Sequence, residues 1–516
     1  MTNASRRAAG KPLFWMLLLL AAYFIPRGEY SNPDSHLALS YALVEQHTVR
    51  IDRYLEMSGT RDTLIDKAVY CGPQTSTATC HRYFTDKAPG ISLVVAAVYG
   101  AIRPLLPRSL MPTRPGSDRF ILRLLLTLLA MTLPCAAFVV SYRRFLADLA
   151  GEVPALIVAV GYGFGSMALP FSTLLFSHAL SAALLFWAFM LIFQALPRPR
   201  ERCHGAPAGW EDDAWLADSQ GMGIPARAMR AAQRSSLRVP VAWQPLAAGL
   251  LAGYAIGCEY PTAIIAGLLG LYALSGDGTV VERAAVAARY GIGLLIGVAP
   301  LLIYNLVAFG NPLALGYVHL TDPQYAAGMA HGILGVGLPT WSAVWGTTFS
   351  PYRGIFILSP WLLLAAPGLL AMGRAGWRRE AWLCGAISVS YFLFQSGYAF
   401  WDGGASVGPR HFLPALPFLA LPVAFAVRRA AWRRLAIGLV SFSVVTLLLV
   451  LVTNPTYVPP APVPFVDQTL HDLASGRLQN NWGMLFRLPG FASLVPLAIA
   501  LFLLGRGMMR QWPRHA

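Results

Sequence analysis

The stretch LAIGLVSFSVVTLLLVLVT at residues 435–453 contains no charged residue. A helix of about 20 apolar residues is long enough to cross the hydrocarbon core of a bilayer. Apolar runs of comparable character recur along the whole chain of 516 residues. A transmembrane barrel would instead require short strands of alternating polarity. The pattern therefore predicts an all-α polytopic membrane protein.

The composition excludes a soluble enzyme. Hydrophobic residues make up 56% of the chain and charged residues only 12%, whereas soluble domains carry about 25% charged residues. The formal net charge is +16, from 40 Lys+Arg against 24 Asp+Glu. Such an excess is typical of the cytoplasmic loops of multi-span proteins, and no basic segment interleaved with aromatic residues indicates nucleic-acid binding. We therefore expect a multi-pass protein of the inner (plasma) membrane, surrounded by lipid and without a nucleic-acid partner.

The distribution of arginine predicts the topology. Clusters such as 143–144, 374–379 and 428–434 all become cytoplasmic if segment 90–107 lies along the membrane surface instead of crossing it. This gives about 12 spans with both termini inside and with external juxtamembrane helices; a thirteenth crossing remains an alternative. The apolar runs considered are 11–26, 90–107, 119–142, 153–171, 177–196, 245–258, 261–275, 287–309, 354–373, 380–400, 411–427, 435–453 and 491–505.

The first external loop, 27–118, carries the most informative polar residues. Asp34 directly follows the first apolar run, and Asp86 and Lys87 precede the run that begins near residue 90. A carboxylate at a membrane surface can act as a general base, and a lysine at headgroup depth can bind a phosphate. The structural alternatives are that Asp34 caps a helix and that Lys87 extends to the interface. Cys71 and Cys80 lie in the same loop, and a disulfide between them is left open.

These residues resemble a known family. Asp34 after the first span, the Ala- and Leu-rich segment 37–44 and the sequence YFTDKAPG at 83–90 are similar to glycosyltransferase family 39 of the C-type (GT-C) superfamily of membrane glycosyltransferases. That family includes protein O-mannosyltransferases and the lipid A aminoarabinose transferase. The resemblance is clearest over about residues 10–275, although residues 32–35 read NPDS where the family usually has Asp-Glu.

The resemblance implies a domain organisation. A GT-C-like catalytic membrane module would span 1–275, including the external loop 27–118, and a variable transmembrane module would span 276–516. Loop 197–244, rich in Pro, Gly and mixed charges, is expected to be a flexible cytoplasmic segment.

The resemblance also implies a reaction. A sugar would move with inversion from a polyprenyl-phosphate donor to a cell-envelope acceptor, which is a glycolipid, a polysaccharide or a protein, on the periplasmic face. Asp34 would deprotonate the acceptor hydroxyl, and Lys87, Arg353 and Arg410 would bind the donor phosphate. Further candidates for the substrate pocket are Tyr83, Asp86, His178, Glu259, Trp401 and Asp402.

Two further questions concern metal dependence and alternative functions. Asp34, Asp52 and Asp86, with Asp402, offer hard oxygen ligands for a divalent cation such as Mg²⁺ or Mn²⁺, but nothing in the sequence fixes their geometry. An O-antigen ligase or polymerase would use residues of loop 310–353, which holds His319, His331 and Arg353. A lipid or sugar transporter would show inverted repeats, and none is apparent.

Overall fold

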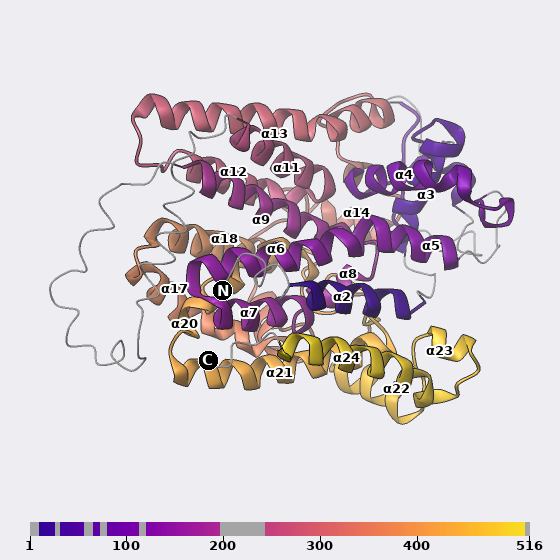
Figure 1. The fold of residues 1–516 in the computed structure, drawn as a ribbon. Helices are drawn as coiled ribbons and strands as arrows, with labels where there is room; N and C mark the ends of the chain where they lie inside the picture. Colours follow the sequence, from indigo (N-terminus) through magenta and orange to yellow (C-terminus); the bar gives the residue numbers. More distant parts are fainter. Residues whose placement is uncertain are drawn as a thin grey trace, which may run out of the picture.

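The structure is a computed structural model, and it describes residues 10–25, 31–55, 65–72, 80–112, 120–196 and 243–510. Long helices run side by side through a bundle, and short elements gather at one end of it, near α3 and α4 (Figure 1). The helical architecture predicted from the apolar runs is confirmed. Most of the predicted cytoplasmic loop 197–244 lies outside the described residues.

The first part of the chain supplies helices from both the bundle and its end. They are α2 (Lys11–Tyr23), α3 (Ser31–Gln46), α4 (Gly90–Ile102), α5 (Phe120–Thr127), the π-helical turn η5 (Leu128–Thr132), α6 (Leu133–Ala150), α7 (Glu152–Phe164), α8 (Ala168–Ser172) and α9 (Ser177–Ala195). The segment from α5 to α6 is continuous over Phe120–Ala150. These bounds follow the apolar runs, because each run must bury its backbone hydrogen bonds within a helix.

The second part of the chain completes the bundle. Its longer helices are α11 (Gln244–Cys258), α12 (Ala263–Ala273), α13 (Val280–Phe309), α17 (Ala365–Arg374), α18 (Arg378–Gly397), α21 (Ala430–Thr453) and α24 (Val495–Arg510). Shorter elements are η7 (Tyr260–Thr262), η8 (Gly316–His319), α14 (Pro323–Met329), α15 (Trp341–Thr348), α16 (Ile355–Leu358), η9 (Pro360–Leu364), η10 (Arg410–Ala415), α19 (Leu416–Ala420), α20 (Val423–Ala426), η11 (Phe465–Leu470), α22 (His471–Ala474), α23 (Trp482–Leu485) and η12 (Gly490–Leu494).

Two predicted spans are broken into short helices. The run 354–373 becomes α16, η9 and α17, and the run 411–427 becomes η10, α19 and α20. Pro360 opens η9, and Pro414, Pro417 and Pro422 interrupt the second run. Proline has no backbone N–H and clashes with the preceding turn, so each proline interrupts the hydrogen bonding of a continuous helix.

Five described helices are long and apolar enough to cross a membrane, and six shorter apolar helices accompany them. The five are Phe120–Ala150, Ser177–Ala195, Val280–Phe309, Ala430–Thr453 and Gly490–Gly507. The short ones include Gly90–Leu105, the segment predicted to lie along the membrane. The total of about 12 crossings remains a prediction.

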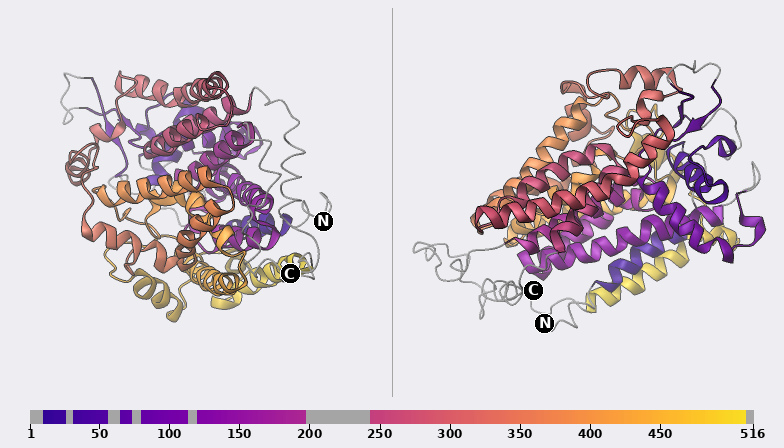
Figure 2. Two further views of the ribbon diagram at one scale, coloured as in Figure 1. Left: turned by 90° about the vertical axis from the view of Figure 1, so that its left-hand side faces the viewer. Right: turned by 90° about the horizontal axis from the view of Figure 1, so that it is seen from above.

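Helices α11 and α13 pack very closely along one side of the bundle (Figure 1). A Cβ atom added at Gly253 would lie 2.2 Å from the carbonyl oxygen of Leu294, and one at Gly293 would lie 2.0 Å from that of Leu246. Gly249 and Gly297 make equally close approaches. On the opposite side, α24 packs against α2 (Figure 2). The close α11–α13 contact is the small-residue packing typical of membrane helices.

Parts of the segment predicted to be the first external loop, 27–118, lie at the end of the bundle (Figure 1). Helix α3 packs against α4, and strands β1 (Ala68–Val69) and β2 (Tyr83–Phe84) pair antiparallel, with Ala68 opposite Phe84. Cys71 and Cys80 form a disulfide beside this ribbon, which answers the question that the sequence left open. The ribbon leads directly into the segment 85–89, where the polar residues of interest lie.

Candidate functional site

Lys87 lies between two carboxylates in the loop before α4. Its Nζ atom is 2.6 Å from Oδ1 of Asp66 and 3.0 Å from Oδ2 of Asp86. The three side chains are largely removed from solvent, with 16%, 20% and 2% of their surfaces exposed. The ring of Tyr317 lies 5.3 Å from the ammonium group. One largely buried cation therefore pairs with two largely buried carboxylates. Burial of a charged group destabilises the fold unless the group is paired or takes part in binding.

The two carboxylates differ in their affinity for protons. Burial raises the pKa of Asp86 to about 6, although Lys87 acts against this effect and Asp66 adds to it. Burial also acts to raise the pKa of Asp66, but the charge and hydrogen bond of Lys87 outweigh it and leave the pKa below its usual range. At neutral pH Asp86 is therefore the carboxylate that takes up a proton more readily.

Neighbouring helices hold this segment in place through its backbone. The hydroxyl of Tyr304 donates to the carbonyl of Thr85 at 2.9 Å, and that of Tyr254 donates to the carbonyl of Gly90 at 2.7 Å. A Cβ at Gly90 would lie only 2.6 Å from Sγ of Cys258. Only a glycine allows α4 to begin against the end of α11.

A second polar cluster contains His178, Glu259 and His411. His178 is the second residue of α9, Glu259 follows the last residue of α11, and His411 lies in η10. Their ligand-type atoms all lie within 4.8 Å of one another. Nδ1 of His178 contacts Oε1 of Glu259, to which the hydroxyl of Ser177 also donates. Three segments far apart in the sequence thus converge at one point.

The Lys87 pair and the His178 cluster are electrostatically connected. Lys87 and Arg410 both act on the His411 imidazole, and Arg410 acts on Asp66. The Arg410 guanidinium lies over the ring of Phe176, 5.0 Å from its centroid. Lys87, Asp86, His178, Glu259 and Arg410, all candidates from the sequence, therefore belong to one buried polar region.

Asp34 occupies the first turn of α3, with 6% of its side chain exposed. Its Oδ1 atom is 2.6 Å from a guanidinium nitrogen of Arg123 on α5. The next residue, Ser35, hydrogen-bonds through its hydroxyl to that of Thr85 at 2.6 Å. Asp34 thus lies at the edge of the polar region, with an arginine that orients its carboxylate.

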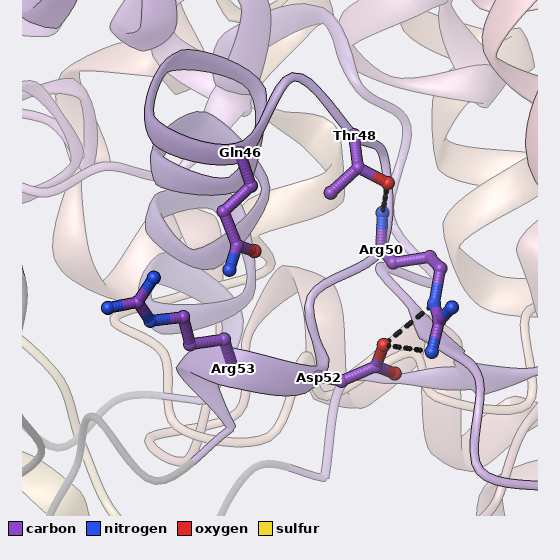
Figure 3. A pocket seen from close by; sticks show the side chains of 5 residues that line it. All are labelled: Gln46, Thr48, Arg50, Asp52 and Arg53. Atoms are coloured by element: carbon purple, nitrogen blue, oxygen red, sulfur yellow. Dashed lines mark hydrogen bonds and ion pairs between the residues drawn. The ribbon is translucent and has the colours of Figure 1, made fainter.

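Asp52 lies at a different place, in an open depression of about 540 Å³ that is also lined by Gln46, Thr48, Arg50 and Arg53 (Figure 3). Arg50 forms an ion pair with Asp52 at 2.7 Å. The other Asp52 oxygen accepts a hydrogen bond of 2.6 Å from the backbone N–H of Tyr83. This carboxylate therefore fixes the β2 strand to the loop before it.

The Arg353 guanidinium is buried and donates to backbone carbonyls. Its partners are the carbonyls of Ser406 and, at 2.6 Å, Gly404. Asp402 accepts a hydrogen bond of 3.1 Å from the hydroxyl of Tyr352. Trp401 fits over Gly346 of α15, where a Cβ atom would lie 2.2 Å from the indole. These contacts hold the loop 401–408 that leads into Arg410.

The candidate metal residues fall into two sets. Three of the four carboxylates chosen from the sequence have a basic partner in the structure: Asp34 pairs with Arg123, Asp52 with Arg50 and Asp86 with Lys87. The fourth, Asp402, accepts a hydrogen bond from Tyr352. Within the described ranges, the group with metal-compatible spacing is instead His178, Glu259 and His411. Imidazole nitrogens and a carboxylate suit a first-row transition metal better than Mg²⁺.

Three residues of this region did not emerge from the sequence as site candidates. Asp66 lies in a polar loop and has no distinguishing neighbour in the sequence. His411 follows the candidate Arg410 directly. Arg123 gave the clearest signal, because it is a charged residue within the apolar run 119–142, and such residues are rare and functional in membranes.

Comparison with known proteins shows a weak likeness to solved structures. No protein-family model matches the chain, and no curated protein matches it. Among solved structures, the chain is similar to the apo form of the Archaeoglobus fulgidus oligosaccharyltransferase, with a TM-score of 0.42 and 13% sequence identity. The match covers 91% of this chain but 56% of that one, so the chain spans just over half the length of that structure. Fold and activity must therefore be argued from the residues of this chain.

Proposed function

We propose that this protein is a membrane glycosyltransferase that moves a sugar from a polyprenyl-phosphate donor to a cell-envelope acceptor on the periplasmic face of the plasma membrane. The observation that carries the proposal is the buried Lys87, held 2.6 Å and 3.0 Å from Asp66 and Asp86 at the start of α4. A cation preorganised in a buried polar region next to apolar helices suits a phosphate carried on a lipid tail.

Charge balance supports phosphate binding at Lys87. An anionic donor that displaces one carboxylate from the ammonium group leaves that carboxylate without its partner, which is costly in a buried site. Asp86 can accept a proton at this point, because burial raises its pKa to about 6. Donor binding would then exchange the Asp86–Lys87 contact for a phosphate–Lys87 contact, with uptake of one proton.

Arg410 and Arg353 take different parts in this proposal. The Arg410 side chain borders the same region and adds positive charge beside the phosphate. Arg353 already donates to the carbonyls of Gly404 and Ser406. Its role would be to position the loop that carries Arg410, which differs from the direct phosphate contact expected from the sequence.

Asp34 is the proposed base. It would accept the proton of the acceptor hydroxyl as that oxygen attacks the anomeric carbon and the bond to the phosphate oxygen breaks with inversion. The contact with Arg123 orients the carboxylate. Removal of a general base typically costs about 10²–10⁴-fold in rate. Tyr83, Trp401 and Asp402 stay candidates for contacts with the sugar or the acceptor, and a Mg²⁺ or Mn²⁺ requirement at Asp34, Asp52 and Asp86 stays a prediction.

The test is complementation of a deletion strain with wild type or Asp34→Asn, followed by mass spectrometry of lipid-linked sugars, envelope glycans and glycoproteins. We expect wild type, but not Asp34→Asn, to restore one sugar mass, and the donor lipid to accumulate where transfer is lost. Asp277→Asn is the matched control, because Asp277 also pairs with an arginine, Arg379, outside the site. Restoration by Asp34→Asn, or no change in any glycan, would favour the transporter alternative or a structural role.

A further inference from the structure

We infer that His178, Glu259 and His411 form a binding site for a first-row transition metal ion, of which Zn²⁺ is the best-suited example. The ligand-type atoms of the three residues lie within 4.8 Å of one another. Donor atoms bound at about 2.0–2.1 Å to one zinc ion lie about 3.4 Å apart in tetrahedral geometry. Small side-chain rotations that move the donor atoms by on the order of 1 Å would bring all three atoms within bonding distance of a single ion.

The donor set indicates which ion fits. Two imidazoles and one carboxylate are the protein ligands of many catalytic zinc sites, in which the fourth position stays open to water or substrate. The same set disfavours Mg²⁺ and Ca²⁺, which prefer oxygen ligands. The site is therefore different in place and in chemistry from the all-carboxylate set Asp34, Asp52 and Asp86.

A second observation points to a missing ligand. The His178 side chain is 3% exposed, and neither of its ring nitrogens makes a hydrogen bond to the described residues, although Nδ1 contacts Glu259. A buried imidazole nitrogen without a partner is costly, and coordination of a metal would satisfy it. The ring of His411 lies 5.1 Å from that of His178, so both imidazoles can face one ion.

The surroundings of the cluster resemble those that orient metal ligands. The Ser177 hydroxyl donates to Glu259, and the ring of Tyr398 packs edge-on against His411 at 5.3 Å. Outer contacts of this kind fix the rotamers of coordinating side chains. Each ligand also sits at the boundary of a helix, where α9, η10 and the end of α11 meet, so the scaffold is rigid.

The position of the site gives the ion a role that rests on the proposed function. Arg410 directly precedes His411 in the chain, and the charge of Lys87 acts on the His411 imidazole. A divalent cation here would add positive charge beside the place proposed for the donor phosphate. Its open coordination position would suit a phosphate or sugar oxygen of the donor.

The experiment is metal reconstitution of the full chain in detergent. After chelator treatment, the protein is reloaded with Zn²⁺ and, separately, with Co²⁺, whose visible spectrum reports on imidazole and carboxylate coordination. We expect about one tightly bound ion per chain, and a loss of affinity of at least about 100-fold in His178→Gln, Glu259→Gln and His411→Gln. His331→Gln, which changes an exposed histidine outside the cluster, should bind as wild type does.

Two results would overturn the inference. Wild type that takes up no ion, or an ion retained equally by all three cluster variants, would place the metal elsewhere or nowhere. Thermal unfolding with and without Zn²⁺ checks that each variant is folded. Sugar transfer by the same samples separates the two proposals, since metal binding without transfer contradicts only the proposed function, and transfer without metal binding contradicts only this site.

Discussion

Two buried parts of the molecule differ in chemical character. The contact between α11 and α13 is close packing of apolar helices, whereas the region around Lys87 is polar. In the helix pair, Gly253 and Gly293 let the two backbones approach until a single added methyl group would overlap a carbonyl oxygen. In the polar region, Lys87, Asp86 and His178 bring charge and hydrogen-bonding groups into space that could have been filled with apolar side chains.

The two regions differ in what holds their residues in place. Close packing between apolar helices stabilises the fold directly, through dispersion contacts and backbone proximity. Buried ion pairs contribute little net stability, because desolvation offsets their attraction. The comparison indicates that the helix pair is a structural feature, whereas the polar region is the part of the molecule that we propose for binding and chemistry.

The largest effect on stability is expected in the helix pair. Gly293→Ala would place a methyl group 2.0 Å from the carbonyl oxygen of Leu246, and such overpacking costs about 1–3 kcal/mol or more. The measurement is the thermal unfolding temperature of the purified protein in detergent, with the sugar-transfer rate per folded molecule unchanged.

The matched control lies on the same helix. A Cβ at Gly291 meets no atom within 4 Å, so Gly291→Ala should leave stability unchanged or raise it slightly. If Gly293→Ala is as stable as Gly291→Ala, the close approach of the two helices is not a determinant of the fold.

An effect of intermediate size is expected in the apparent KM for the donor, which should change with pH. Below its pKa of about 6, Asp86 is protonated, and its carboxyl no longer repels the donor phosphate, which stays anionic throughout. Above this pH the carboxylate competes for Lys87, so the apparent KM for the donor should rise by up to about tenfold per pH unit. Steady-state kinetics between pH 5 and pH 8 would measure this.

The Asp86→Asn variant removes the titrating group. It should show a low donor KM that no longer changes over this range, because the amide neither ionises nor repels the phosphate. A pH profile identical to that of wild type would mean that Asp86 does not compete with the donor for Lys87.

The smallest effect is expected from a salt bridge at the surface. Nε of Arg477 lies 2.9 Å from Oδ1 of Asp472, and 57% and 25% of the two side chains are exposed. Arg477→Gln should cost less than about 1 kcal/mol in the free energy of unfolding and leave transfer unchanged. A large loss of transfer would extend the functional region beyond the buried residues.

Much of the fold was predictable because long apolar runs in a sequence indicate membrane helices. The run 435–453 became α21 with nearly the predicted bounds. The broken helices after Pro360 and around Pro414 were not predicted. A proline within an apolar run does not by itself show whether the helix breaks, since Pro300 lies inside the continuous helix α13. The four-residue spacing of Gly249 and Gly253, and of Gly293 and Gly297, was a usable signal for the α11–α13 contact.

The sequence identified several residues of the polar region, but not which of them are in contact. His178 and Glu259 each stood out as polar residues between apolar runs, yet their separation in sequence hides their contact. Lys87 and Asp86 are adjacent, whereas Asp66 reaches Lys87 only through the folding of the external loop. Such pairings depend on tertiary packing, which a single sequence does not encode in any local pattern.

The most direct measurement is donor binding by the purified chain with Lys87 changed. Lys87→Met removes the charge but leaves two carboxylates without their cation, which destabilises the fold. The double variant Lys87→Met/Asp66→Asn leaves only one such carboxylate and serves as the variant that is expected to stay folded. With a polyprenyl-phosphate sugar in nanodiscs, we predict that both variants lose donor affinity by at least about 100-fold, while Lys87→Arg retains part of it. Wild-type affinity in a folded Lys87→Met/Asp66→Asn protein would contradict the assignment of Lys87 to the donor phosphate.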